Sequence, residues 1–276
     1  MKKILLLLTL TTTFIFANLK VVASIAPVMS YIEAIGKDRV DTTLMVEAGA
    51  SPHTYEPKPS QMVAITMADL YFAIGVEFEN IWLDKFHSLN SCLEVVHLDS
   101  GIKKLYMSNL HTKNAKKDPH IWTSPTNIET IATNIYKALV KADSKNSDFY
   151  KKNYDDFIAH IEEVKKEIKS SLKDTPKGSK FMVFHPSWGY FANEFGLKQI
   201  PIEIEGKKPK PQELLSILKE AKRANIKAIF TQPEFSDATA RVISSELNID
   251  VIKVSPLAKD WETTLLKIAN AIGQRD

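Results

Sequence analysis

The chain has 276 residues, of which 44% are hydrophobic and 25% are charged. This balance excludes intrinsic disorder, a collagen-like sequence and a polytopic membrane protein as descriptions of the whole chain, and the length permits one large domain or two of ordinary size. The net charge of +3, from 36 Lys and Arg residues against 33 Asp and Glu, gives no electrostatic reason to expect nucleic acid as a partner.

Residues 1–17 predict a secretory signal peptide. Lys2 and Lys3 form a basic start, Ile4–Phe16 is apolar apart from four threonines, and Ala17 is a small residue suited to cleavage. The apolar run is shorter than the ~20 residues that span a membrane. We therefore expect a mature periplasmic protein that begins near Asn18 and has no stable membrane insertion, with a retained N-terminal anchor as the lesser alternative.

Residues 18–145 predict an α/β lobe. Short apolar runs alternate with segments of helical spacing, which is typical of a mostly parallel sheet covered by helices. Strands are expected at Leu19–Ile25, Arg39–Val46, Leu70–Ile74 and Leu93–Leu98, and helices at Pro27–Ile35, Ser60–Met67 and Ser124–Lys141. Cys92 is the only cysteine, so no intramolecular disulfide is possible, and we expect it to be buried as a small hydrophobic residue.

Residues 146–174 predict one long linking helix. Ser147–Leu172 contains no Gly or Pro, and its apolar residues recur at helical spacing among Lys and Glu until Asp174–Gly178 stops the pattern. A helix of this length spans ~39 Å. Such a helix between two α/β halves would act as a rigid strut rather than as a flexible hinge.

Residues 175–276 predict a second α/β lobe, so the fold expected is α/β, with two lobes, each a mostly parallel sheet with flanking helices, joined by the long helix. Strands are expected at Phe181–Phe184, Gln199–Ile204, Ala228–Thr231 and Val251–Val254, and helices at Trp188–Phe195, Pro211–Ala224, Asp237–Leu247 and Trp261–Ile272.

Three of the seven histidines lie next to Pro in loops at expected strand ends: His53, His120 and His185. In open α/β sheets, ligands bind at the carboxyl ends of strands, and neutral imidazole suits Zn²⁺, Cu²⁺ and Ni²⁺. Spacing in the sequence does not by itself establish that the three converge, and a single loop histidine is more often a surface residue. His87 and His97 are interpreted as structural and His160 as solvated, and His111 lies in the lysine-rich loop Lys103–Lys117.

The sequence resembles the metal-binding solute-binding proteins of bacterial ABC importers, most closely the periplasmic zinc-binding components of the ZnuA type. The resemblance covers nearly the whole mature chain and rests on Gly49–Ser60, Ala68–Leu70, Asp118–Trp122, Phe184–Phe191, Glu205–Pro211 and Gln232–Phe235. It implies two lobes with a metal buried between them, bound by His53, His120 and His185. It further implies delivery of Zn²⁺ to a membrane permease without catalysis, and we expect a monomer.

His185 bears on which metal is carried. Manganese binders of this family tend to have a carboxylate at the third position and zinc binders a histidine, so the resemblance favours zinc, with manganese or iron transport as the alternative. Three histidines and a water also describe a zinc-dependent hydrolase, but no His-Glu-x-x-His pattern places a general base. An adhesion or structural role has no independent support in the sequence.

Two positions depart from the family pattern. Ser255 stands where the family often has an Asp ligand, which leaves water, Asp260 or Glu234 as the fourth ligand. The zinc branch commonly carries a long loop rich in His and acidic residues, whereas Lys103–Lys117 is short and basic and contains only His111. A metal-gathering role for this loop is therefore not supported.

Overall fold

The computed structural model describes residues 18–107, 116–203 and 207–273. The predicted signal peptide and His111 lie outside these ranges. Within them, no helix combines the length and the apolar character that crossing a bilayer requires.

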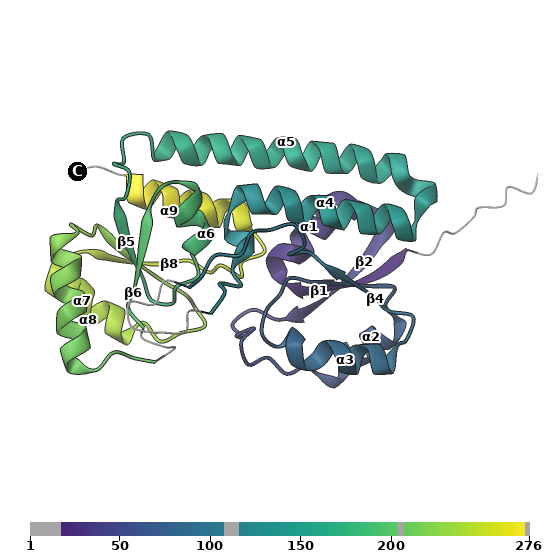
Figure 1. Cartoon of the computed structure of the whole chain (residues 1–276), viewed down its shortest axis with the longest axis horizontal. Helices are drawn as coiled ribbons and strands as arrows, with labels where there is room; N and C mark the ends of the chain where they lie inside the picture. Colours follow the sequence, from purple (N-terminus) through teal and green to yellow (C-terminus); the bar gives the residue numbers. More distant parts are fainter. Residues whose placement is uncertain (1–17, 108–115, 204–206, 274–276) are drawn as a thin grey trace, which may run out of the picture.

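The first half forms a four-stranded parallel sheet in the order β2-β1-β3-β4 (Figure 1). Its strands are β1 (Leu19–Ile25), β2 (Val40–Val46), β3 (Leu70–Ala73) and β4 (Glu94–His97). The associated helices are α1 (Ala26–Gly36), α2 (Pro59–Met67), α3 (Glu79–Leu89) and α4 (Pro125–Ala142), the last preceded by the short 3₁₀ turn η2 (Ile121–Thr123).

The second half repeats this topology in a four-stranded parallel sheet ordered β6-β5-β7-β8. Its strands are β5 (Lys180–Val183), β6 (Lys198–Pro201), β7 (Ala228–Thr231) and β8 (Asp250–Lys253). The associated helices are α6 (Gly189–Glu194), α7 (Pro211–Arg223), α8 (Ala238–Leu247) and α9 (Trp261–Gly273). The predicted fold class is confirmed.

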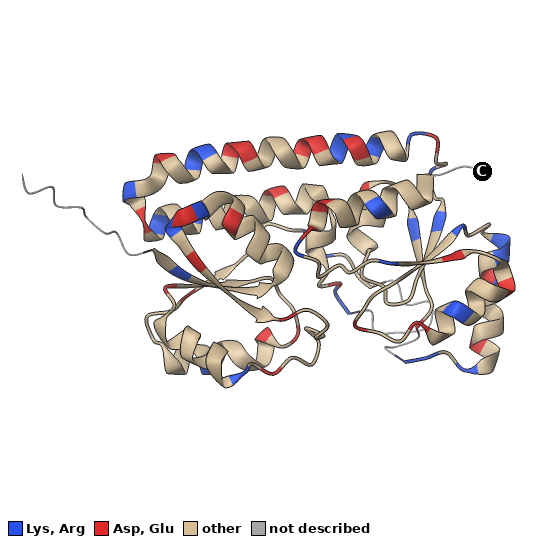
Figure 2. Cartoon of the chain, turned by 180° about the vertical axis from the view of Figure 1, so that it is seen from behind, with Lys and Arg blue, Asp and Glu red and all other residues tan. Residues whose placement is uncertain are grey.

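Helix α5 (Ser147–Ser171) runs along one side of both halves (Figure 1). At 25 residues it is about 38 Å long. Its buried stripe packs against α1, α4 and α9, and basic and acidic residues alternate on its outer face (Figure 2). The predicted linking helix is therefore present, whereas the lobe boundaries at 145 and 175 stay a prediction.

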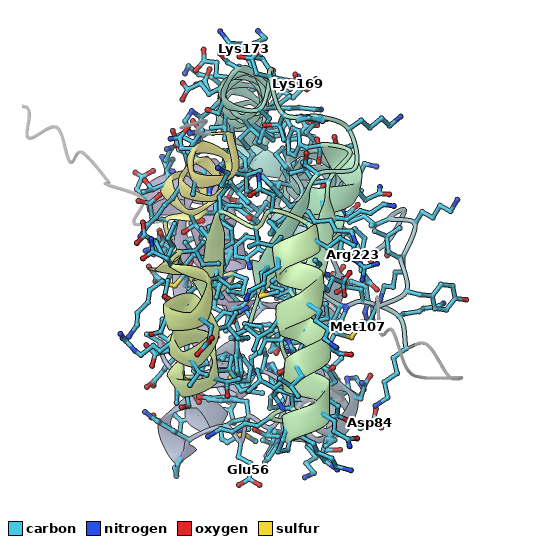
Figure 3. All side chains as sticks on the ribbon, turned by 90° about the vertical axis from the view of Figure 1, so that its left-hand side faces the viewer. Glu56, Asp84, Met107, Lys169, Lys173 and Arg223 are labelled. Carbon is cyan, nitrogen blue, oxygen red and sulfur yellow. The ribbon has the colours of Figure 1, made fainter. Side chains whose placement is uncertain are left out.

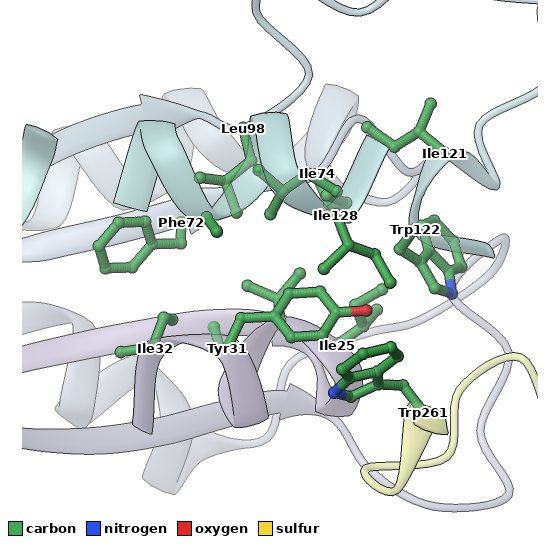
Figure 4. Packing of buried hydrophobic residues seen from close by; sticks show 14 of the residues in the cluster. Ile25, Tyr31, Ile32, Phe72, Ile74, Leu98, Ile121, Trp122, Ile128 and Trp261 are labelled. Atoms are coloured by element: carbon green, nitrogen blue, oxygen red, sulfur yellow. The ribbon is translucent and has the colours of Figure 1, made fainter. Parts of the chain in front are cut away.

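One hydrophobic cluster extends from the first sheet through α5 and α9 to Phe181 and Phe230 of the second sheet. Trp261 of α9 packs edge-on against Tyr31 of α1, with ring centroids 5.8 Å apart (Figure 4). A smaller separate cluster lies between the second sheet and helices α7 and α8. Because apolar packing connects the halves, movement of one half against the other would expose hydrophobic surface.

Two expectations from the sequence are corrected. Helix α3 was not expected, because its apolar residues form no clear stripe and its N-terminus has no side-chain cap. The buried Glu79 carboxylate instead accepts hydrogen bonds from the backbone N–H groups of Ile74, Gly75 and Val76.

Cys92 is exposed rather than buried, because the turn that holds it lies outside the core. Charged side chains cover the outer surface, such as Asp84 on α3 and Lys169 on α5 (Figure 3).

Candidate metal site

The structure brings the three predicted histidines together. One potential ligand atom from each of His53, His120 and His185 lies within 4.8 Å of the other two, and no second group of this kind occurs among the described residues. His87 and His97 are exposed and do not join the group. His160 is only half exposed, and its Nε2 lies 2.7 Å from the Glu262 carboxylate, so it is paired rather than simply solvated.

His53 lies in the loop that follows β2. The chain turns at Gly49, which has a φ of 82°, and the Pro52 carbonyl then accepts a hydrogen bond from the Phe78 amide next to α3. This contact places the Glu77 carboxylate beside the ring, with its Oε2 2.9 Å from His53 Nδ1. The His53 side chain is 27% exposed, which makes it the most accessible of the three histidines.

His120 lies immediately before η2 in a buried segment. The Asp118 carboxylate accepts a hydrogen bond from the His120 amide at 2.9 Å and lies 2.7 Å from His120 Nδ1. Two residues further on, the Trp122 indole N–H donates to the Pro256 carbonyl of the second half at 2.7 Å. The backbone and the ring of His120 are thus both fixed by the same carboxylate.

His185 lies just beyond the carboxyl end of β5. The order of the second sheet reverses between β5 and β7, and this is where α/β sheets bind ligands. The side-chain amide of Gln232, which follows β7, accepts a hydrogen bond from the His185 N–H and donates one to the His185 carbonyl. Phe235 stacks on the His185 ring, with the ring centroids 4.9 Å apart. Glu203, which follows the adjacent strand β6, has its Oε1 2.8 Å from His185 Nδ1.

All three rings therefore have the same arrangement, with Nδ1 next to a carboxylate. A ring that donates its Nδ1 proton to a carboxylate keeps the Nε2 lone pair free for a metal. The Nε2 atoms of His53 and His185 are 3.3 Å apart. Two such lone pairs repel unless a proton or cation binds them, and two nitrogens on one tetrahedral zinc ion lie about 3.3 Å apart. The donors and their spacing fit a metal ion.

The pKa values of two rings move in opposite directions. Burial lowers the pKa of His185 below its ordinary value, and the nearby Glu203 only partly opposes this shift. Burial also disfavours the charged form of His53, but the hydrogen bond and attraction of Glu77 outweigh it and raise the pKa of His53. In return, pairing with His53 overcomes the effect of burial and lowers the pKa of the Glu77 carboxyl.

A small cavity of about 20 Å³ adjoins the three imidazoles, and it has room for about one water-sized ligand. Glu234 is the carboxylate residue on its wall, and its Oε1 accepts a hydrogen bond of 2.9 Å from the Ser255 hydroxyl. Asp260 does not line the cavity, because its carboxylate accepts from the Thr263 amide at the start of α9. Of the two predicted carboxylate residues, Glu234 thus lines the cavity and Asp260 does not, and neither belongs to the group of ligand atoms that lie within 4.8 Å of one another.

The carboxylate partners Glu77, Asp118 and Glu203 were not predicted as site residues. Asp118 carried a signal, since it lies two residues before His120 and metal-binding histidines usually donate their second N–H to a carboxylate or carbonyl. Glu203 carried none, because only the pairing of β5 with β6 brings it next to His185.

Comparisons with known proteins identify the family of this chain. The family described as the periplasmic zinc-uptake complex component A, ZnuA, matches residues 21–272. The high-affinity zinc uptake system protein ZnuA of Bacillus subtilis (strain 168) is 27% identical over 243 residues, which cover 83% of this chain and 76% of that protein. The manganese ABC transporter substrate-binding lipoprotein PsaA of Streptococcus pneumoniae is 26% identical over 262 residues, covering 89% and 83%.

A crystal structure of ZnuA superposes with a TM-score of 0.87 at 38% identity and covers 93% of this chain and 98% of that one. The match extends over both sheets and the long helix, as the sequence resemblance implied. The chain therefore belongs to the ZnuA family of metal-binding substrate-binding proteins of ABC importers.

Proposed function

We propose that this protein captures Zn²⁺ with His53, His120 and His185 and delivers it to the membrane permease of an ABC importer. The observation that carries the proposal is the convergence of the three imidazoles, each with Nδ1 against a carboxylate. Nitrogen donors favour Zn²⁺, whereas Mn²⁺ prefers oxygen ligands. Relatives are named for both metals, so the preference for zinc rests on this donor set.

Glu234 is our candidate for the fourth ligand. Three neutral imidazoles leave the full +2 charge on the metal, so a carboxylate that approaches it is stabilised. Glu234 already lines the cavity and binds Ser255, the residue at the position where the family often has Asp. If the Glu234 carboxylate released the Ser255 hydroxyl and bound the metal, it would complete a tetrahedral set of four ligands. A water molecule is the alternative fourth ligand.

The proposed delivery requires an extracytoplasmic protein, in agreement with the signal peptide expected at residues 1–17. We further propose that it acts as a monomer and catalyses no reaction. A hydrolase needs space for its substrate next to the metal, and ligand sites for small molecules typically occupy ~300–1,000 Å³. The cavity of about 20 Å³ accepts an ion with a water-sized ligand and is far too small for an ester or a peptide.

Titration of the metal-free protein with Zn²⁺ and Mn²⁺, in competition with a chelator of known affinity, tests the assignment. We expect one Zn²⁺ per chain and tighter binding of Zn²⁺ than of Mn²⁺. Free Zn²⁺ at 100 times the Kd should increase the free energy of unfolding by about 2.7 kcal/mol. Tighter binding of Mn²⁺ would reject zinc as the cargo, and the absence of binding to either metal would reject metal capture.

A further inference from the structure

We propose that Gly189, in the second half of the chain, is a positioning residue for His120, in the first half. The proposal rests on the proposed function, since it assigns His120 to the metal. Gly189 is the first residue of α6 and does not line the cavity. It acts through the carboxylate of Asp118.

The space that Gly189 leaves free is filled by Asp118. A Cβ atom at position 189 would lie 2.6 Å from Asp118 Oδ2, a distance that real Cβ contacts do not reach. Asp118 has little freedom to withdraw, because its side chain is 2% exposed and its other oxygen binds both the backbone and the ring of His120. A methyl group at position 189 would therefore displace the carboxylate that orients His120.

Other residues of α6 fix the same segment of the first half. The Tyr190 hydroxyl donates to the Asp118 carbonyl at 2.9 Å and accepts from the Leu105 amide at 3.0 Å. The Glu194 carboxylate accepts from the Thr126 hydroxyl at 2.7 Å and from the Thr126 amide at the start of α4. Helix α6 thus holds the segment around Asp118, and a side chain at position 189 would contact the Asp118 carboxylate itself.

The backbone permits a substitution at this position. Gly189 begins a helix and does not have the positive φ that disfavours side chains, so Gly189→Ala adds a steric contact without backbone strain. Gly36 is a matched control. Gly36 ends α1, and its Cβ would also lie 2.6 Å from a neighbour, but that neighbour is the Val40 side chain at the start of β2, outside the metal site. Both changes create a steric contact at 2.6 Å, and only one of these contacts is with Asp118.

The experiment measures the Zn²⁺ affinity of Gly189→Ala, Gly36→Ala and His120→Ala by chelator competition. We expect Gly189→Ala to weaken binding by about tenfold or more, as loss of an orienting carboxylate does, and Gly36→Ala by less than about twofold. The visible absorption of the Co²⁺-loaded protein, which reports coordination geometry, should change in Gly189→Ala and stay as in the parent in Gly36→Ala.

A double-mutant cycle with Asp118→Ala tests whether Gly189 acts on His120 through the Asp118 carboxylate. Truncation of Asp118 removes the nearest atom that the new methyl group would meet and leaves Gln199 Nε2, the end of a flexible side chain, at 3.2 Å. Gly189→Ala should therefore cost little further affinity in that background. If Gly189→Ala does not fold by itself, the double variant should fold, because the contact at 2.6 Å with Asp118 is gone. A double variant that also fails to fold, or two losses that simply add, would overturn the proposal.

The outcomes separate this inference from the proposed function. If His120→Ala weakens Zn²⁺ binding but Gly189→Ala behaves like Gly36→Ala, Gly189 is not a positioning residue and the metal site stands. If His120→Ala binds Zn²⁺ as tightly as the parent, the metal site itself is wrong.

Discussion

The two halves of the molecule have the same strand order but surround their histidines differently. In the first half, His53 is 27% exposed and its partner Glu77 is 45% exposed, whereas His120 and its partner Asp118 are only 4% and 2% exposed. In the second half, His185 and its partner Glu203 are 10% and 6% exposed. Repeated topology therefore brings ligands to one place, whereas local burial sets how readily each ring takes up a proton.

The largest effect is expected from loss of the one ligand that the second half supplies. His185→Ala removes a metal bond and the contribution of the second half, so Zn²⁺ affinity should fall by more than the ~100-fold upper range for loss of a residue that only orients a ligand. His53→Ala and His120→Ala should each weaken binding at least ~10-fold. Chelator competition at fixed pH measures all three.

His160→Ala is the control for these variants, because His160 is half exposed and pairs with Glu262 away from the three-histidine group. Its Zn²⁺ affinity should match that of the parent. Parental affinity in His185→Ala would contradict a site formed by both halves.

Glu203 and Glu77, the carboxylate partners of His185 and His53, differ in burial and should therefore differ in their effect on Zn²⁺ affinity. Glu203→Gln keeps the shape of the side chain but removes its charge, and in a buried pair this should lower Zn²⁺ affinity by about 10- to 100-fold. Glu77→Gln should cost less at pH 8, because solvent already screens the exposed pair. The same titration measures both variants. Equal losses of Zn²⁺ affinity would mean that burial of the carboxylate does not determine how much it contributes to metal binding.

The opposite pKa shifts predict that His53 takes up a proton before His185 as the pH falls. Its pKa lies above the ordinary value and that of His185 lies below it. A protonated imidazole cannot bind metal, so Zn²⁺ affinity should begin to fall above pH ~6.5, approaching tenfold per pH unit for one competing proton. Titrations from pH 8 to pH 5.5 measure the onset.

Glu77→Gln removes the group that raises the pKa of His53, so the onset should move to lower pH in this variant. The metal-free protein should follow the same linkage. A raised folded pKa at His53 adds stability that is fully present below pH ~6.5 and is lost as the pH rises through that pKa. An unchanged onset in Glu77→Gln would show that the Glu77 pair does not control the protonation of His53.

The smallest effect is expected at the fourth ligand. Glu234→Gln removes the carboxylate from the cavity wall, but a water molecule can replace it on the metal, so Zn²⁺ affinity should fall by less than about tenfold. Identical affinities for this variant and the parent would identify water as the fourth ligand. Metal analysis of both proteins checks that each still binds one Zn²⁺ per chain.

The sequence was sufficient for the fold class, because alternating strands and helices and one uninterrupted helical stretch are local patterns. It also identified the three histidines, through their Pro-flanked loops and the family resemblance. It could not identify Glu203, which lies 18 residues from its partner and reaches it only through the pairing of β5 with β6. Helix α3 was not predicted because its start is supported by the side chain of Glu79, a buried acidic residue that carries no helix signal in the sequence.

The unequal exposure of the ligands has a consequence for the rates of metal exchange. An arriving ion can meet His53 while it still holds most of its water, whereas bonds to His120 and His185 require dehydration within the protein. We therefore expect changes at His53 and Glu77 to alter mainly the association rate, which depends on accessible charges. Changes around His185 should alter how long the ion stays bound, so the permease would obtain its cargo fastest by disturbing the second half.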